Sequence, residues 1–383
     1  MSQSKQTSPT LLRGAMALGA LGVLGSYVTA GHERFWANWV FWFVLMFTLG
    51  LGALFIVALE HLVNAKWSVP VRRIPERVAT LLLPAIPVGL IALCALPVLY
   101  PGTRPEAAHN PILAGKAFWL GVPFFSVRTL LSFGLCTLGL WVLVGGSLRQ
   151  DTTRDPAFNL RARKFAPAFM ASFALVITLV AFDWLSGLTP EWYSDIFGVY
   201  IFAGAFLSGL AATVLCLLYL QDRDRLGGVK GDHLFNLGGF LFAFTVFWSY
   251  IGFAQYMLMW YANMPDEVMY YKVRLAGSWR AITITLALVH FILPFFALVT
   301  RAAKKDPKRL RRVAYLMLGA HLLDLYWLIF PVLGARPLFS WPELSFALFF
   351  IGGITLWVRG AMEKGEDMPV GDPFLREGLE FRL

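Results

Sequence analysis

About ten apolar stretches, each long enough to cross a lipid bilayer, constrain the fold of this chain more than any other feature. A membrane-spanning helix needs about 20 mostly apolar residues, because a helix rises about 1.5 Å per residue and the hydrocarbon core is about 30 Å thick. Hydrophobic residues make up 58% of the 383 residues. We expect spans at 12–30, 36–62, 81–100, 122–146, 166–188, 196–220, 234–262, 279–300, 313–334 and 342–359. The sequence therefore predicts an all-α integral membrane protein.

The loops between these stretches are short, so consecutive helices are expected to be antiparallel neighbours. We expect one membrane domain, in which a first four-helix bundle (36–188) and a second (196–334) lie between peripheral first and last helices. A cytoplasmic tail would follow at 361–383. Two stretches that mix aromatic, basic and proline residues, 64–80 and 101–121, look like interfacial surfaces for lipid headgroups or a partner protein.

The basic residues indicate how the chain is oriented. With the N-terminus in the cytoplasm, 25 of the 33 lysines and arginines fall on the cytoplasmic side, 6 on the other side and 2 within spans. Such a bias is typical of bacterial membrane proteins with both termini inside. The net charge of +10 is spread over many loops, whereas a nucleic-acid surface would gather it on one face. Lipids, and not nucleic acid, are the expected contacts.

The cysteines give no sign of a bound cofactor. Cys94, Cys136 and Cys216 all lie in predicted spans, and their spacing matches no cluster-binding or haem-attachment motif. We expect no disulfide, iron–sulfur cluster, covalent haem or metal in this chain.

One pair of opposite charges is expected inside the membrane. Asp183 lies about five residues from the outer end of the fifth span, and Arg128 lies about six from the outer end of the fourth. Their depths therefore match within a few Å, and an isolated charge at such depth is costly. We expect an ion pair, which is either a fixed structural contact or a carboxylate tuned by Arg128 for proton transfer.

Three titratable side chains are expected near the middle of the membrane in the eighth and ninth spans. His321 and Asp324 are three residues apart, so they share one helix face, and His290 reaches a similar depth in the preceding span. Histidine and aspartate can exchange protons when burial brings their pKa values together. A proton relay is one interpretation. A hydrogen-bonded cluster that joins helices, or axial ligation of a b-type haem by the two histidines, are the alternatives.

Two further groups are weaker candidates. Glu60 and His61 close the second span at its inner end, where they would admit protons or serve as ordinary interfacial residues. Tyr250, Gln255 and Tyr256 in the seventh span could bind a quinone, or pack with satisfied hydroxyl groups. No catalytic residue is predicted.

Several strings between residues 60 and 335 carry a family resemblance. They are Trp67–Glu76, Phe182–Leu185, Pro190–Tyr200, Phe242–Trp248, Gln255–Met257, Trp260–Asn263 and His321–Trp327. Together they resemble the ActF-type membrane subunit of bacterial alternative complex III, which is similar in fold to the NrfD and polysulfide-reductase membrane subunits. The resemblance implies ten helices arranged as two four-helix bundles between peripheral first and last helices.

The resemblance also implies a function. The chain would be a membrane subunit of a respiratory quinol:cytochrome c (or other acceptor) oxidoreductase in the bacterial inner membrane. Menaquinol or ubiquinol would be the reductant, and partner subunits would carry haem c and iron–sulfur clusters. A paralogous NrfD-like subunit would oxidise the quinol, and a terminal oxidase is a further candidate partner. For the ActF-type subunit itself the family suggests a non-catalytic scaffold without a prosthetic group, with proton conduction through polar residues such as Asp183, His321 and Asp324 left open.

Two other functions remain open at this point. The chain could be the quinol-binding subunit of an NrfD-like oxidoreductase, or a free-standing secondary transporter. A transporter is expected to have interrupted helices at corresponding places in two halves. The prolines Pro84, Pro87 and Pro97 cluster in the third span without a clear counterpart.

Overall fold

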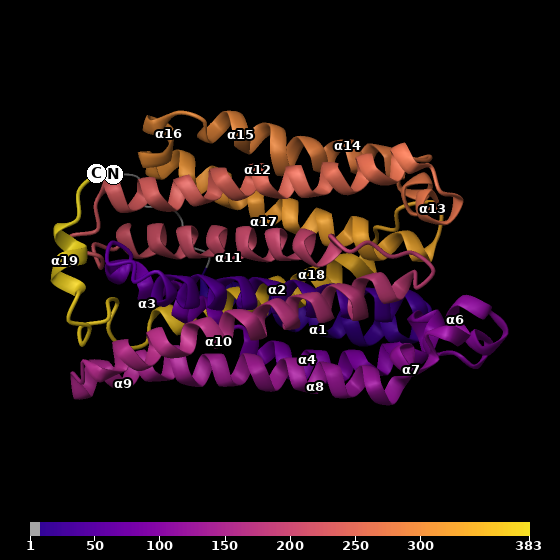
Figure 1. The fold of residues 1–383 in the computed structure, drawn as a ribbon, viewed down its shortest axis with the longest axis horizontal. Helices are drawn as coiled ribbons and strands as arrows, with labels where there is room; N and C mark the ends of the chain where they lie inside the picture. The colour runs from indigo at the N-terminus through magenta and orange to yellow at the C-terminus, as the bar shows by residue number, and fades with distance from the viewer. Residues whose placement is uncertain (1–7) are drawn as a thin grey trace.

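A computed structural model describes residues 8–383, and in this part of the chain ten helical segments are long and apolar enough to cross a membrane. In chain order they occupy Pro9–Thr29, His32–Leu62, Val69–Leu99, Val122–Thr153, Ala157–Leu188, Phe197–Gln221, Gly231–Ala262, Trp279–Leu298, Pro307–Leu333 and Trp341–Met362. The helices lie side by side along the longest axis of the molecule (Figure 1). The fold is thus the predicted all-α membrane fold of ten spans.

The spans are built from α1 (Pro9–Thr29), α2 (His32–Leu62), α3 (Val69–Ala79), α4 (Leu82–Ala92), α5 (Leu96–Leu99), α8 (Val122–Gly139), α9 (Gly145–Thr153), α10 (Ala157–Leu179), α11 (Phe197–Gln221), α12 (Gly231–Ala262), α14 (Trp279–Ala287), α15 (Leu293–Leu298), α17 (Pro307–Ile329) and α18 (Trp341–Met362). The connections hold the short helices α6 (Pro111–Gly115), α7 (Ala117–Leu120), α13 (Pro265–Arg274), α16 (Arg301–Lys305) and α19 (Leu375–Glu380).

Local sequence explains where individual helices begin. Asp306 precedes α17, and its carboxylate accepts a hydrogen bond from the Lys308 amide, while Pro307 occupies the first helical position. Ser340 precedes α18, and the Glu343 carboxylate accepts from the Ser340 amide. Both arrangements satisfy amide groups that have no partner inside the helix.

The helices fall into two packed groups. One contains α2, α4, α8 and α10, and the other contains α11, α12, α14 with α15, and α17. The groups meet along α2 and α11, whose most apolar segments are 94% and 83% buried. The helices α1 and α18 pack mainly on each other and are only 17% buried. They therefore lie at the periphery.

At the centre, α2 and α11 touch backbone to backbone. A Cβ atom added to Gly52 would lie 1.9 Å from the carbonyl oxygen of Ala205, and one added to Gly209 would lie 2.5 Å from the amide nitrogen of Ala53. Only glycine has room at these two positions. Small residues of this kind allow membrane helices to approach closely.

The third span differs from the prediction. It begins at Val69, not near residue 81, because α3 precedes α4 with only a short break between them. All residues of α3 are buried. The expectation that segment 64–80 is an interfacial surface is therefore wrong for 69–79, because its charged side chains pair within the chain. The other expected surface, 101–121, lies mostly exposed or half-buried around α6 and α7.

Three spans contain a π-helical turn, at Leu140–Val144, Val180–Leu185 and Leu288–Ile292. Such a turn inserts an extra residue into an α-helix and is frequent at functional sites. The second turn carries Asp183 and the third carries His290.

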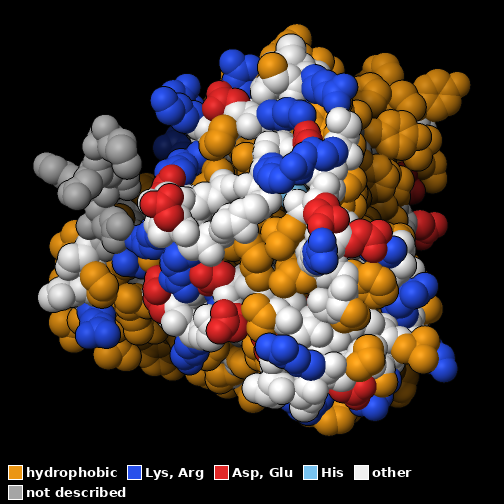
Figure 2. Space-filling view, turned by 90° about the vertical axis from the view of Figure 1, so that its left-hand side faces the viewer, with side chains coloured by type: hydrophobic (Ala, Val, Ile, Leu, Met, Phe, Trp, Pro, Cys, Tyr) orange, Lys and Arg blue, Asp and Glu red, His pale blue; other side chains and the backbone are white. Residues whose placement is uncertain are grey.

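The two ends of the molecule differ in charge. The loops around 149–164, 223–230 and 301–312 lie at the same end as the segment after Met362, and we call this the basic end (Figure 1). Figure 2 looks onto it and shows lysine and arginine side chains spread over the face among carboxylates, with hydrophobic side chains along the flanks. The helices α6 and α13 lie at the opposite end.

Candidate functional site

Arg128 in α8 and Asp183 in the π-helical turn after α10 form a two-pronged ion pair. Arg128 Nε donates to Asp183 Oδ2 at 2.8 Å, and Nη2 donates to Oδ1 at 2.8 Å. Both side chains are buried. Arg128 Nη2 also donates to the carbonyl of Trp119, and the indole ring of Trp119 lies 4.0 Å from the guanidinium carbon. The structure thus places the two residues together, in a contact fixed on several sides.

The second group of helices holds a buried polar cluster. The Tyr200 hydroxyl in α11 donates to Asp324 Oδ1 in α17 at 2.5 Å, and Thr48 Oγ1 in α2 lies 3.0 Å from His321 Nε2. Asp324 and His321 are each 2% exposed. Three helices therefore contribute to one cluster at the junction between the two groups.

The hydrogen bonds of Thr48 indicate which ring nitrogen of His321 carries the proton. The Thr48 hydroxyl donates to the carbonyl of Val44 at 2.8 Å, so its oxygen is left to accept from His321. We infer that His321 carries its proton on Nε2, which leaves Nδ1 as a bare acceptor. Nδ1 has no hydrogen-bond partner in the described part of the chain. Gly204 of α11 faces both residues. A Cβ atom added to Gly204 would lie 3.3 Å from His321 Nδ1 and 3.8 Å from Asp324 Oδ2.

His290 is not hydrogen-bonded to this cluster. Its ring packs edge-on against Trp248 with 3.7 Å between centroids, and Trp248 in turn packs against Tyr200 at 5.4 Å. Neither ring nitrogen of His290 has a hydrogen-bond partner among residues 8–383. The three titratable residues are therefore linked through aromatic rings. His321 Nε2 is engaged by Thr48, and the His290 ring packs on Trp248.

Glu60 and His61 lie buried at the basic end of α2, which argues against the interpretation as ordinary interfacial residues. Glu60 Oε2 accepts from Arg72 Nε at 3.0 Å, and Arg72 Nη1 donates to Asp372 Oδ2 at 2.8 Å. His61 packs edge-on against Phe158, and its Nε2 has no partner in the described chain.

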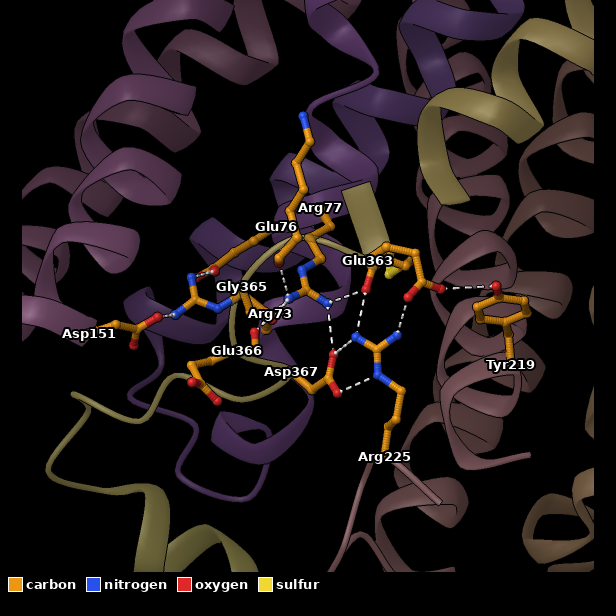
Figure 3. A network of polar contacts seen from close by, with 12 residues as sticks. Arg73, Glu76, Arg77, Asp151, Tyr219, Arg225, Glu363, Gly365, Glu366 and Asp367 are labelled. Atoms are coloured by element: carbon orange, nitrogen blue, oxygen red, sulfur yellow. Dashed lines mark hydrogen bonds and ion pairs between the residues drawn. The ribbon is translucent and has the colours of Figure 1, made fainter. Parts of the chain in front are cut away.

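A larger ion network at the basic end joins α3 to the C-terminal segment (Figure 3). Arg73 pairs with Glu76 at 2.6 Å and with Asp151 at 2.5 Å. Arg77 pairs with Asp367 at 3.1 Å, and Asp367 also pairs with Arg225 at 2.8 Å. Arg77 in addition donates to the backbone carbonyls of Met362, Lys364, Gly365 and Glu366. Arg72 and Arg77 thus hold down the segment after α18, and we call this arrangement the arginine clamp.

Replacing Arg77 by glutamine should loosen the segment 362–367. Each hydrogen bond to a charged donor is worth about 1.5–3 kcal/mol, so losing even one should raise the open population about ten- to hundredfold. Cleavage by endoproteinase Glu-C at Glu363 and Glu366 in the purified protein measures this. Arg376→Gln is the matched control, because Arg376 pairs only at the surface with Glu380, and an equal cleavage rate in both variants would contradict the clamp.

Of the three candidate quinone-binding residues, two line a common cavity. Gln255 and Tyr256 border a cavity of about 270 Å³ between α12, α13, α14 and α17, together with Tyr200 and Trp248. Tyr250 does not line it and is 66% exposed.

The sequence reasoning missed several members of these sites. Tyr200 and Thr48 were not singled out, since buried hydroxyl groups are common and carry no charge. Tyr200 lies in one of the strings that carry the family resemblance, and this was the one available signal. Arg274, one of the six basic residues that the sequence places on the outer side, does lie there at the end of α13, but it is buried and donates to the carbonyls of Tyr270, Trp327 and Leu328. Burial lowers the pKa of Arg274.

No group of three or more histidine, cysteine, aspartate or glutamate side chains within residues 8–383 is arranged to hold a metal ion. A scan against protein-family models finds no match for the sequence, and a search of curated proteins finds none either.

Proposed function

We propose that this chain is a non-catalytic membrane subunit of a bacterial respiratory quinol oxidoreductase of the alternative complex III type. It scaffolds the complex and conducts protons through its buried carboxylate and histidine side chains. The family resemblance supports membership of the complex. The concentration of basic residues at one end supports a location in the cytoplasmic membrane with that end inside.

The contact between Tyr200 and Asp324 beside His321 carries the proton-conduction part of the proposal. Asp324 and His321 can each gain or lose a proton, and Tyr200 extends the hydrogen-bonded chain. Nδ1 of His321, which has no hydrogen-bond partner in the described chain, and Oδ2 of Asp324 both lie within 4 Å of the Cβ position of Gly204. A water molecule between two polar groups can bridge them, and we propose that one in front of Gly204 passes a proton between the histidine and the carboxylate.

Glu60 and His61 would supply the cluster from the basic end. Glu60 lies 12 residues from Thr48 along α2, which is about 18 Å. Ser208 and Thr213 of α11 donate to their own helix backbone. Because α2 and α11 are in backbone contact at Gly52 and Gly209, proton transfer over this stretch requires water molecules along another face of α2.

Membership of the complex is tested by purification. The tagged chain, extracted in mild detergent, should bring down c-type haem with an absorbance band in the visible range. A colourless single chain that exchanges a solute across vesicles would instead identify a secondary transporter.

Asp324→Asn tests the proton path within the complex. The variant keeps the shape of the side chain and its contact with Tyr200 but cannot cycle a proton, so it should assemble with full haem content while releasing fewer protons per quinol oxidised. Gly204→Ala, which narrows the space beside His321, should act in the same direction. Asp222→Asn is the control, because Asp222 pairs with Arg311 at the surface. If Asp324→Asn and Gly204→Ala both released as many protons as the wild type, the cluster would be a structural contact and not a proton path.

A further inference from the structure

The cavity between α12, α13, α14 and α17 opens toward the lipid. Phe253, at its rim, is 61% exposed, and Ala287 on α14 is exposed beside it. Both lie on membrane-spanning helices. A molecule that enters here therefore comes from the bilayer.

The lining of the cavity is aromatic and uncharged. Trp248, Trp327 and Phe291 provide flat apolar walls, and Gly252 faces the ring of Tyr200, which a Cβ at that position would approach within 3.1 Å. No lysine, arginine or carboxylate of residues 8–383 lines it. The phosphate of a phospholipid would find no counter-ion here, whereas a neutral ring would stack on the walls.

The Tyr271 hydroxyl on the wall can donate a hydrogen bond into the cavity. Ser194 Oγ donates to Gln255 Oε1 at 3.1 Å, and Gln255 Nε2 donates to the Tyr271 hydroxyl oxygen at 2.9 Å. These two contacts orient the amide and leave the Tyr271 proton without an acceptor in the described chain. Burial raises the pKa of Tyr271, so the hydroxyl keeps this proton. Tyr271 is thus a directed hydrogen-bond donor for an oxygen in the cavity.

The opposite wall leads to the buried cluster. Tyr200 lines the cavity, and its hydroxyl donates to Asp324. A ligand oxygen near Tyr200 would lie next to the proposed proton path.

We infer that this cavity binds the ring of a lipid-soluble quinone or quinol, with one ring oxygen on Tyr271 and the ring between the tryptophan walls. The volume of about 270 Å³ is at the small end of ligand pockets, which typically measure about 300–1,000 Å³, so it holds a headgroup while the tail stays in the bilayer. The inference rests on the proposed function and deepens it by placing a quinone site in this chain.

The test uses the purified full chain in lipid nanodiscs, titrated with decylubiquinone and with 2-methyl-1,4-naphthoquinone, and follows tryptophan fluorescence. Trp248 and Trp327 in the wall should be quenched saturably. Tyr271→Phe should weaken binding roughly three- to tenfold, the loss of one neutral hydrogen bond. Ala287→Phe, which narrows the mouth, should abolish saturable quenching. Tyr250→Phe is the matched control, because Tyr250 lies outside the cavity, and it should bind as the wild type does.

Two outcomes would overturn the inference. Equal, unsaturable quenching in all four proteins would mean that the quinone only dissolves in the lipid. A phospholipid retained in native mass spectrometry and lost in Ala287→Phe, with no quinone effect, would make the cavity a lipid site. Quinone binding by a chain that purifies without haem proteins would instead overturn membership of the complex and leave this site intact.

Discussion

Replacing Gly52 by leucine should prevent the two groups of helices from docking. A Cβ at position 52 would lie 1.9 Å from the Ala205 carbonyl oxygen and 2.6 Å from its carbon, so the obstacle is backbone and not a side chain that can turn away. Overpacking of a core usually costs about 1–3 kcal/mol because side chains adjust. Here α2 is enclosed on nearly all sides, so we expect the cost to exceed that range and the folded protein to be lost.

Size-exclusion chromatography of a fluorescent fusion, with a thermal-stability measurement on any monodisperse protein, checks this result. Gly134→Leu on α8 is the matched control, since no atom lies within 4 Å of a Cβ at that position. A Gly52→Leu protein with the yield and melting temperature of the control would refute the close contact between α2 and α11.

Replacing Arg128 by leucine should destabilise the first group of helices strongly. The change would leave the Asp183 carboxylate buried, without its two hydrogen bonds from the guanidinium. Removing one partner of a buried ion pair costs about 3–5 kcal/mol, whereas replacing both with apolar residues is often neutral. We therefore expect the double variant Arg128→Leu with Asp183→Leu to recover much of the stability that the single variant loses.

A double-mutant cycle on the purified protein, with melting temperature as the readout, measures this coupling. The pair Arg311 and Asp222 provides the comparison, because both side chains are at least one-third exposed, and such pairs contribute about 0–1 kcal/mol. If Arg128→Leu were as mild as Arg311→Leu, Asp183 would have to be stabilised by some other contact.

The sequence predicted the number of spans and the contact between Arg128 and Asp183. Both depend only on the length of the apolar stretches and on the depth of a residue within its span. Hydrophobic length sets the number of crossings, and residues at equal depth on consecutive antiparallel helices can meet. The shared helix face of His321 and Asp324 followed from their spacing. Each of these inferences depends only on how far a residue lies along the axis of its own helix.

Contacts that depend on how helices rotate were not predictable in this way. Thr48 and Tyr200 reach the cluster from α2 and α11, and nothing in their local sequence says which way they turn. His290 lies on a π-helical turn, where the extra residue changes the direction of the side chain, and it meets Trp248 instead of the Asp324 cluster. The sequence did not predict the burial of α3, because charged residues are expected at the surface unless they have partners. Two of those partners, Asp367 and Asp372, lie about 300 residues away in the chain.

The arginine clamp at the basic end has a consequence for the order in which the protein is made. Arg72 and Arg77 leave the ribosome about 300 residues before Asp372 and the carbonyls of 362–366, their partners in the finished fold. At roughly 5–20 residues per second, these C-terminal partners follow about 15–60 s later, while Arg72 already has Glu60 of α2 as a partner. The contacts of α3 with the C-terminal segment therefore form only after the rest of the chain has been made. Closure of this end is a late step, because Arg77 has no access to its carbonyl partners until the segment 362–366 has been made.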